Sequence, residues 1–226
     1  MMRYPDGIER PPPPARQVCG ALLNYRADLA GLGERMRAAP YQAPPRAPVL
    51  YLKPRNTWIA GGDPIPLPFN AQRLCVGATL GLVFGRTCVR ATEATAAGFL
   101  AGLCVINDAC LPHEVIFRPA IEERCRDGFC PIGPSGPMPA VGLAASWRMR
   151  TYVNGELRGD WCTGECVRSA ARLIADVSEF MSFHPGDILM LGTPRDLPVA
   201  TAGDRVAVEV EGVARLENPI VREDAR

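Results

Sequence analysis

Short apolar runs separated by turn residues dominate the hydrophobic pattern of the chain. A continuous apolar run over 76–84 predicts a strand that is buried on both faces, and LCVIND at 103–108 predicts another. Between them, Thr92 has the side chain of an N-cap and predicts a helix through about Gly102. This strand–helix–strand spacing is typical of a crossover unit, in which a helix connects two parallel strands.

The C-terminal third of the chain has the most regular pattern. Asn154-Gly155 lies between two candidate strands over 147–157, and this dipeptide predicts a hairpin. Apolar residues at helical spacing predict a helix that begins at Thr163 and ends before Pro185-Gly186. Apolar and polar residues alternate over 205–221, which predicts a strand and a partner strand. We therefore expect a β-rich protein with a few helices.

The segment order predicts one domain with an extension at each end. Residues 1–17 are rich in proline and predict an extended arm, which is either a disordered tag or a segment that drapes over a neighbouring subunit. The stretch 18–29 predicts a short strand, a turn and a helix. Without an internal repeat or a sign of a second domain, we expect a single domain over 18–221 and a polar tail over 222–226.

Composition narrows the class of protein. The 226 residues include 25 basic and 24 acidic side chains, so the near-zero net charge of +1 gives no support for nucleic-acid binding. We predict no membrane span, since the longest strongly apolar run is too short. The nine cysteines include no CxxC pair, which argues against a thiolate zinc site. With no signal peptide at the start, we expect a soluble protein of the reducing cytoplasm.

Seven short motifs occur in an order that resembles one known family. They are NYR, YLKP, ND, DGFCPIGP, VNGE, PGDILMLGTP and GDRVAVEVEGVARLEN. Together, over about 18–221, they are similar to the fumarylacetoacetate hydrolase family. Within it, VGATLGLVFGRT, NDACLPH, RPAI and CRDGFCPIGP look like the branch of isomerase/decarboxylases that degrade 4-hydroxyphenylacetate, in its N-terminal half or separate N-terminal subunit.

The resemblance implies a mixed α+β fold, namely a β-rich sandwich or roll with a few helices, that is usually oligomeric. It also implies Mg²⁺, or Mn²⁺ or Ca²⁺ in its place, on a Glu-x-Glu pair and a distant Asp. In this chain the pair is replaced by Gly77 and Thr79, and Asp108 alone matches a metal ligand. One carboxylate with a threonine hydroxyl is a poor Mg²⁺ site. The resemblance therefore supports the family fold for this chain, whereas its residues match the family's metal site poorly.

Three functions are consistent with the resemblance. The first is a subunit that isomerises and decarboxylates an unsaturated 2-oxo or 2-hydroxy di- or tricarboxylic acid in aromatic catabolism. The second is a non-catalytic subunit that assembles with a metal-bearing homologue. The third is an acylpyruvate-type hydrolase that cleaves a C–C bond. We expect a small dicarboxylate substrate, and either a homo-oligomer or a hetero-oligomer with that homologue.

Five residues are candidates for the site, and each also has a structural explanation. Asp108 is the candidate metal ligand, but its carboxylate can instead cap the following turn. Lys53, the sole lysine, can hold a substrate carboxylate or pair with an acid near 61–63. Arg124 stands at a family lysine position and can bind a carboxylate bidentately, although loop arginines are commonly surface residues. Thr193 lies where the family contacts substrate. His113 can act as acid or base, or be a solvated loop histidine.

Glu209 and Glu211 form a true Glu-x-Glu pair on a predicted strand. The apolar residues that alternate with them, Val208 and Val210, belong to the other face of that strand. The simplest prediction is that the two glutamates face solvent and bind no metal.

Overall fold

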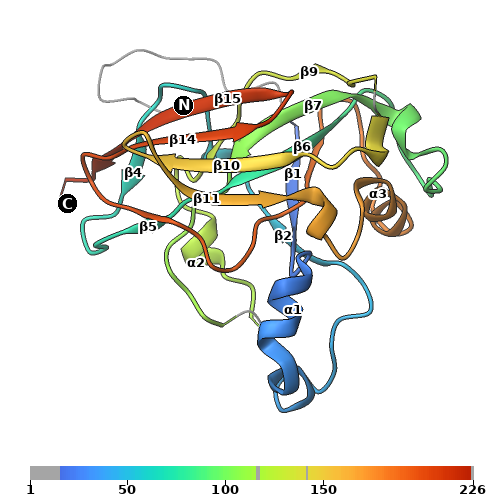
Figure 1. Cartoon of the computed structure of the whole chain (residues 1–226), viewed down its shortest axis with the longest axis horizontal. Helices are drawn as coiled ribbons and strands as arrows, with labels where there is room; N and C mark the ends of the chain where they lie inside the picture. The colour runs from blue at the N-terminus through green and yellow to red at the C-terminus, as the bar shows by residue number, and fades with distance from the viewer. Residues whose placement is uncertain (1–15, 116–117, 141, 225–226) are drawn as a thin grey trace.

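The computed structural model describes residues 16–115, 118–140 and 142–224 (Figure 1). The predicted N-terminal arm lies outside the described residues except for 16 and 17. The predicted polar tail begins too early, because Arg222 is still paired with Leu67 in the last strand, while 225–226 lie outside the described range. Among the helices in this part of the chain, none is long and apolar enough to cross a membrane.

One sheet of the described fold has six strands in the order β2-β1-β12-β6-β7-β9. Its strands are β1 (Val18–Leu22), β2 (Val49–Leu52), β6 (Ala78–Phe84), β7 (Leu100–Asn107), β9 (Gly136–Pro137) and β12 (Ile188–Met190). β1 and β12 are parallel, and the other neighbours are antiparallel. The sheet is therefore mixed, and its two longest strands, β6 and β7, lie side by side.

A second sheet has five strands in the order β11-β10-β14-β15-β4. Its strands are β4 (Ile65–Leu67), β10 (Arg148–Val153), β11 (Glu156–Cys162), β14 (Arg205–Val210) and β15 (Ala214–Arg222). This sheet packs against β6 and β7, and the main apolar core lies between the two layers. Two further pairs join β5 (Leu74–Cys75) to β13 (Val199–Ala200) and β3 (Trp58–Ile59) to β8 (Cys130–Pro131). The predicted β-rich sandwich is confirmed.

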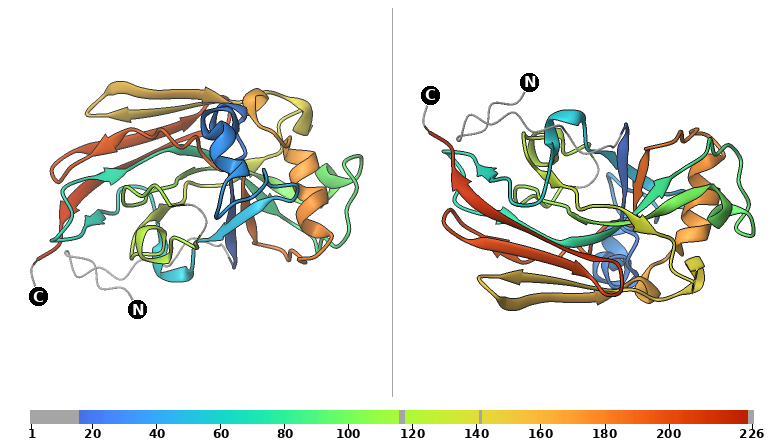
Figure 2. Two further views of the ribbon diagram at one scale, coloured as in Figure 1. Left: turned by 90° about the horizontal axis from the view of Figure 1, so that it is seen from below. Right: turned by 90° about the horizontal axis from the view of Figure 1, so that it is seen from above.

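Short helices lie at the margins of the two sheets. They are α1 (Arg26–Leu32), α2 (Ile121–Arg124) and α3 (Ala170–Ser178). Figure 2 shows α3 at one end of the molecule, opposite the end at which β15 finishes. The predicted start of this helix at Thr163 is wrong, because 163–165 form a separate 3₁₀ turn. The helix begins after Ser169, whose hydroxyl accepts the backbone N–H of Arg172 and so caps its first turn.

The predicted crossover between the two buried strands is wrong. β6 and β7 are antiparallel, so no helical crossover is needed to connect them. In place of a helix from Thr92 to Gly102, the chain forms only a 3₁₀ turn over Ala96–Phe99, and β7 already begins at Leu100. Thr92 and Thr95 bond to each other's side chains and backbone, which closes a tight turn instead of starting a helix.

The hairpin predicted at Asn154-Gly155 is confirmed. Both residues have positive φ angles, 53° and 84°, as a type I′ turn requires. The alternating C-terminal stretch is likewise confirmed as the pair β14 and β15, whose strands run antiparallel. On β14, the side chains of Val206, Val208 and Val210 are buried in the core. These elements depend on near neighbours in the sequence, which is why the pattern alone predicts them.

Candidate functional site

The candidate site lies where the end of β7 meets the start of β6. The backbone N–H of Asp108, just after β7, donates to the carbonyl oxygen of Gly77 at 2.9 Å. The N–H of Gly77 donates in turn to the Asn107 side-chain oxygen at 3.1 Å. Because the pairing of the two strands fixes this register, Asp108 lies beside the residues that replace the Glu-x-Glu pair. The structure thus brings together the positions that the resemblance implies.

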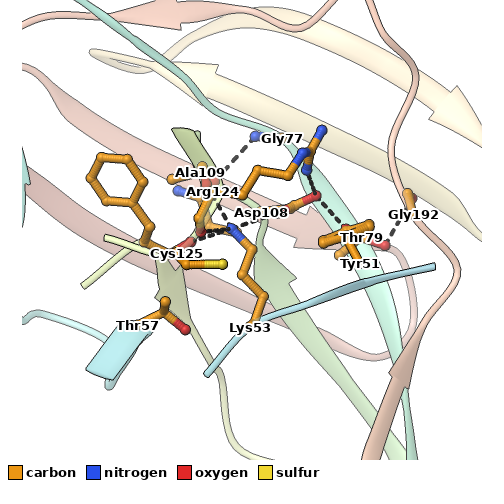
Figure 3. Close-up of polar contacts among 12 residues, drawn as sticks. Tyr51, Lys53, Thr57, Gly77, Thr79, Asp108, Ala109, Arg124, Cys125 and Gly192 are labelled. Carbon is orange, nitrogen blue, oxygen red and sulfur yellow. Dashed lines mark hydrogen bonds and ion pairs between the residues drawn. The ribbon is translucent and has the colours of Figure 1, made fainter. Parts of the chain in front are cut away.

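Both oxygens of the Asp108 carboxylate are occupied by side chains of this protein (Figure 3). Lys53 Nζ lies 2.9 Å from Oδ1, and Arg124 Nη1 lies 3.1 Å from Oδ2. The hydroxyl of Tyr51 also donates to Oδ2, at 2.5 Å. The side chains of Asp108 and Lys53 are fully buried. We call these four residues, Tyr51, Lys53, Asp108 and Arg124, the Asp108 cluster.

Lys53 is held by backbone groups as well as by Asp108. Its backbone N–H donates to the carbonyl of Val18, which extends the β1–β2 pairing by one residue. Its ammonium group lies 2.7, 3.1 and 3.0 Å from the carbonyl oxygens of Ala109, Arg124 and Phe129. The acid that pairs with Lys53 is therefore Asp108, and the predicted pairing with an acid near 61–63 is wrong. With its donors occupied, the ammonium group is built into the fold.

Arg124 comes from α2 and reaches the cluster from the other side. Its backbone N–H bonds to Ala120, and its guanidinium lies over the ring of Tyr51 at 4.5 Å from the ring centre. Burial works to lower the pKa of Arg124, but Asp108 and other nearby groups raise it above its ordinary value. The guanidinium is consequently a permanent positive charge inside the protein, in contrast to a surface loop arginine.

Electrostatics keep Asp108 ionised. Burial alone would raise the pKa of Asp108, but the charges of Lys53 and Arg124 and the hydrogen bond from Tyr51 outweigh it. The pKa of Asp108 therefore lies below its ordinary value. For Tyr51 the effect is opposite, because burial and the Asp108 charge raise the pKa of its hydroxyl well above its ordinary value. Tyr51 thus stays a neutral hydrogen-bond donor.

Tyr51 is a cluster member that the sequence reasoning missed. It stands two residues before Lys53, so the two side chains leave the chain on the same face. That spacing within the YLKP motif is the signal that could have identified it. The remaining information, that this face meets Asp108, depends on the strand order of the six-stranded sheet.

The positions that replace the Glu-x-Glu pair offer no metal ligands. A Cβ atom at Gly77 would lie 2.6 Å from Cδ2 of Leu197 and 3.2 Å from Cγ2 of Thr193. The hydroxyl of Thr79 is buried and donates to the carbonyl of Gly192 at 2.8 Å. The space above Gly77 is therefore filled by apolar groups, and the Thr79 oxygen is engaged. Thr193 itself is buried beside Gly77, and its predicted contact with substrate stays a prediction.

His113 belongs to a different environment. Its ring Nδ1 lies 2.9 Å from the carbonyl oxygen of Leu111, which can only accept, so Nδ1 is the donor. The ring lines a pocket of about 1000 Å³ together with Arg35, Glu114 and Arg118, while no member of the Asp108 cluster lines it. The predicted role of His113 as acid or base thus stays a prediction, in a pocket separate from the cluster.

Glu209 and Glu211 are ion-paired on the outer face of the second sheet. Arg150 lies 3.9 Å from Glu209 and 3.1 Å from Glu211, and Arg215 lies 3.6 Å from Glu209. Their carboxylates point away from the core side of β14, which carries the valines. Across the described ranges, no group of three or more His, Cys, Asp or Glu side chains is placed to hold a metal ion.

Comparison with known proteins places these observations in a family. The family profile described as "Fumarylacetoacetate (FAA) hydrolase C-terminal" matches residues 17–221. The chain belongs to the fumarylacetoacetate hydrolase family. One similar protein is the 4-hydroxyphenylacetate degradation bifunctional isomerase/decarboxylase of Escherichia coli. It is 42% identical over 206 residues, which are 91% of this chain and 47% of that protein. The chain spans about half the length of the curated relatives it matches first.

Solved structures agree with the fumarylacetoacetate hydrolase fold. The 5-carboxymethyl-2-hydroxymuconate delta-isomerase of Mycobacterium smegmatis is 30% identical, with a TM-score of 0.78 over 93% of this chain and 80% of that one. Fumarylpyruvate hydrolase of Pseudomonas aeruginosa, solved with Mn²⁺ and pyruvate, is 22% identical, with a TM-score of 0.75 over 92% of this chain and 91% of that one. At that identity the second comparison shows the fold alone.

The residues of this family member do not fit the divalent metal that the family implies. The candidate ligand Asp108 already has a charged or hydrogen-bonded partner on each oxygen. The two other ligand positions carry no carboxylate, and the space above one of them is filled. An ion could bind this carboxylate only if Lys53 or Arg124 moved away.

Proposed function

We propose that the chain is the metal-free unit of an isomerase/decarboxylase that acts on unsaturated 2-oxo or 2-hydroxy di- or tricarboxylic acids in 4-hydroxyphenylacetate catabolism. In this proposal it works with a homologous metal-bearing unit, which is either a separate subunit or the other half of a longer chain. The match to about half of the bifunctional isomerase/decarboxylases supports the two-unit arrangement. The relative at 42% identity supports the reaction class.

One observation carries the assignment of this unit as metal-free. The Asp108 carboxylate that a divalent ion would need is already paired with two cations, Lys53 and Arg124. Two unit charges about 4 Å apart interact with about 4 kcal/mol at an effective dielectric constant of about 20. A divalent ion placed near Asp108 would be repelled by both Lys53 and Arg124 and would compete with them for the same oxygens. The cluster therefore performs the charge neutralisation that the metal performs elsewhere in the family.

The arrangement gives this unit a structural contribution to the assembly. Lys53, Asp108 and Arg124 connect β2, the end of β7 and α2, which are three segments far apart in sequence. We infer that the cluster fixes the relative positions of these segments without a metal. An acylpyruvate-type hydrolase is the weaker assignment, because that C–C cleavage relies on the metal more strongly than isomerisation does.

Reconstitution tests the proposal. The chain is purified alone and, separately, after co-expression with a tagged homologue that carries the Glu-x-Glu pair. Isomerase and decarboxylase activity are then measured with and without added Mg²⁺. We expect the two proteins to co-purify, and we expect Mg²⁺-dependent activity in the complex. The isolated chain should show no response to Mg²⁺.

A matched variant of the partner separates the two units. Glutamine at both Glu positions of the homologue should abolish the activity of the complex while leaving the complex intact. An isolated chain that converts substrate at a Mg²⁺-dependent rate would contradict the metal-free assignment. Failure of the two proteins to associate under any condition would contradict the two-unit arrangement.

A further inference from the structure

Two cysteines face each other next to the Asp108 cluster without belonging to it. Cys75 ends β5, two residues before Gly77, and Cys110 follows Asp108 by two residues. The backbone N–H of Cys75 donates to the carbonyl of Cys110 at 2.8 Å, and the N–H of Cys110 returns a bond to Cys75 at 3.0 Å. The two residues therefore form a hydrogen-bonded antiparallel pair, with both side chains on the same face.

The distance across this pair suits a disulfide. Residues that exchange both backbone hydrogen bonds in an antiparallel pair have Cα atoms about 5.5 Å apart. Disulfides join residues whose Cα atoms are about 4.4 to 6.8 Å apart. The side chains are also near one another, because each thiol shifts the pKa of the other. Both are free thiols in this structure. The Cα separation therefore falls within the disulfide range, and bond formation requires the Cβ atoms to approach from about 4.5 to 5.5 Å to about 3.5 to 4.5 Å.

The two thiols differ in exposure and in acidity. Cys75 is partly exposed, whereas Cys110 is buried. The hydrogen bond from Cys110 lowers the pKa of Cys75, with help from Arg73 and Arg124 and against the effect of burial. The neighbouring Cys75 thiol and burial raise the pKa of Cys110, and His113 works against them. An oxidant from solvent thus meets the more acidic thiol first, with the second thiol in place behind it.

We propose that Cys75 and Cys110 form a redox-active dithiol that a small hydroperoxide converts to a disulfide. In the first step the Cys75 thiolate attacks the terminal peroxide oxygen, and the O–O bond breaks. This gives a sulfenic acid on Cys75 and an alkoxide, or hydroxide when the oxidant is hydrogen peroxide. The leaving oxygen takes up the proton that the Cys75 thiol released on ionising, and it departs as an alcohol or as water. In the second step the sulfur of Cys110 attacks that of Cys75. The S–O bond breaks, and hydroxide leaves as water with the proton of Cys110. The two thiols lose two electrons, which the peroxide gains.

The disulfide would connect the two chain segments that carry the candidate site. One segment leads into Gly77 and β6, and the other leads out of Asp108. Their present connection at this point consists of backbone hydrogen bonds. Oxidation would make that connection covalent and would fix the start of β6 against the residues that follow β7.

Peptide mapping of the full chain tests the proposal. The reduced protein is exposed to graded hydrogen peroxide, free thiols are blocked with one alkylating label, and disulfides are then reduced and labelled with a second. We expect Cys75 and Cys110 to lose the first label together, and we expect a linked peptide that contains both. Cys125 is the internal control, since it is also partly exposed but burial raises the pKa of its thiol. It should react only at higher peroxide concentration.

Two serine variants resolve the order of the steps. In Cys110→Ser, Cys75 should accumulate as a sulfenic acid that dimedone traps. In Cys75→Ser, Cys110 should remain reduced at the concentration that oxidises the unmodified chain. Equal oxidation of Cys75 and Cys125, or over-oxidation of Cys75 while Cys110 keeps the first label, would overturn the proposal. If either variant fails to fold, the peptide mapping of the unmodified chain still tests the proposal.

Discussion

Carboxylates meet arginine or lysine in two contrasting regions of the molecule. In the Asp108 cluster, a single carboxylate between strands of the six-stranded sheet is fully buried and holds both Lys53 and Arg124. On the outer face of the second sheet, Glu209 and Glu211 form a Glu-x-Glu pair whose side chains are 27% and 59% exposed. The region with the metal-ligand spacing lies in solvent, and the region at the family's metal position lacks the spacing.

The difference shows that spacing alone does not make a metal site. Two glutamates at i and i+2 share a face of any strand, but here Arg150, Arg215 and the Tyr152 hydroxyl contact them on the outer face of the second sheet. In the Asp108 cluster the ion pairs are buried, and removing Asp108 leaves two buried cations without their counter-ion.

The largest effect is expected from Asp108→Asn. This change keeps the shape of the side chain but removes the charge that balances Lys53 and Arg124. Breaking a buried ion pair by removing one partner lowers the free energy of unfolding by about 3 to 5 kcal/mol. Urea denaturation followed by circular dichroism measures the change. A loss of less than about 1 kcal/mol, which is typical of a surface pair, would contradict the role given to the cluster.

The pH dependence of that loss sharpens the comparison. Because the pKa of Asp108 is lowered in the folded protein, its stabilising contribution is fully present above the unfolded value of about 3.9 and is lost as the pH falls through the folded value. The stability difference between the unmodified chain and Asp108→Asn should be constant from about pH 7 to pH 5 and shrink below about pH 4. A difference that grows on acidification would show that the sign is wrong.

A smaller effect is expected from Gly77→Ala. The new Cβ would meet Cδ2 of Leu197 at 2.6 Å, and we expect a loss of about 1 kcal/mol in the free energy of unfolding, since that side chain can partly move. Gly31→Ala is the matched control, because nothing lies within 4 Å of its Cβ position and it lies in α1. There alanine should stabilise by about 0.5 to 1 kcal/mol. Equal effects at the two glycines would mean that the space above Gly77 is open.

The smallest effect is expected from Glu209→Gln. Its partners Arg150 and Arg215 are 26% and 49% exposed, and surface pairs of this kind contribute about 0 to 1 kcal/mol. The same denaturation experiment should detect little change at low salt and none at about 1 M NaCl, where the Debye length falls to about 3 Å. A salt-independent loss as large as that of Asp108→Asn would remove the contrast between the two regions.

Local pattern predicted the elements that depend on local contacts. The hairpin at Asn154-Gly155, the β14–β15 pair and the buried run that becomes β6 follow from turn chemistry and alternation. The helix predicted from Thr92 does not form. A threonine side chain can cap a helix or close a tight turn, and the residue type alone does not distinguish the two. Here Thr92 and Thr95 bond to each other, and β7 already begins at Leu100.

The sequence predicted which residues belong to the candidate site, but not which of them contact one another. Motif order located Asp108, Lys53 and Arg124, yet it did not show that they touch one another. Lys53 contacts Asp108 although β1, β12 and β6 separate β2 from β7 in the six-stranded sheet. No spacing within the sequence carries that strand order. The absence of the Glu pair was visible in the sequence, but the filled space above Gly77 depends on Leu197, which is 120 residues away by the numbering.

A Mn²⁺ titration of the purified chain, read by electron paramagnetic resonance, tests the central claim most directly. Free Mn²⁺ has a sharp six-line signal that weakens on binding, and a family member with the Glu-x-Glu pair provides the positive control. Because Lys53, Arg124 and Tyr51 occupy the Asp108 carboxylate, the account predicts that added Mn²⁺ retains its full free signal in the presence of this chain. A stoichiometric loss of the signal that Asp108→Asn abolishes would contradict it.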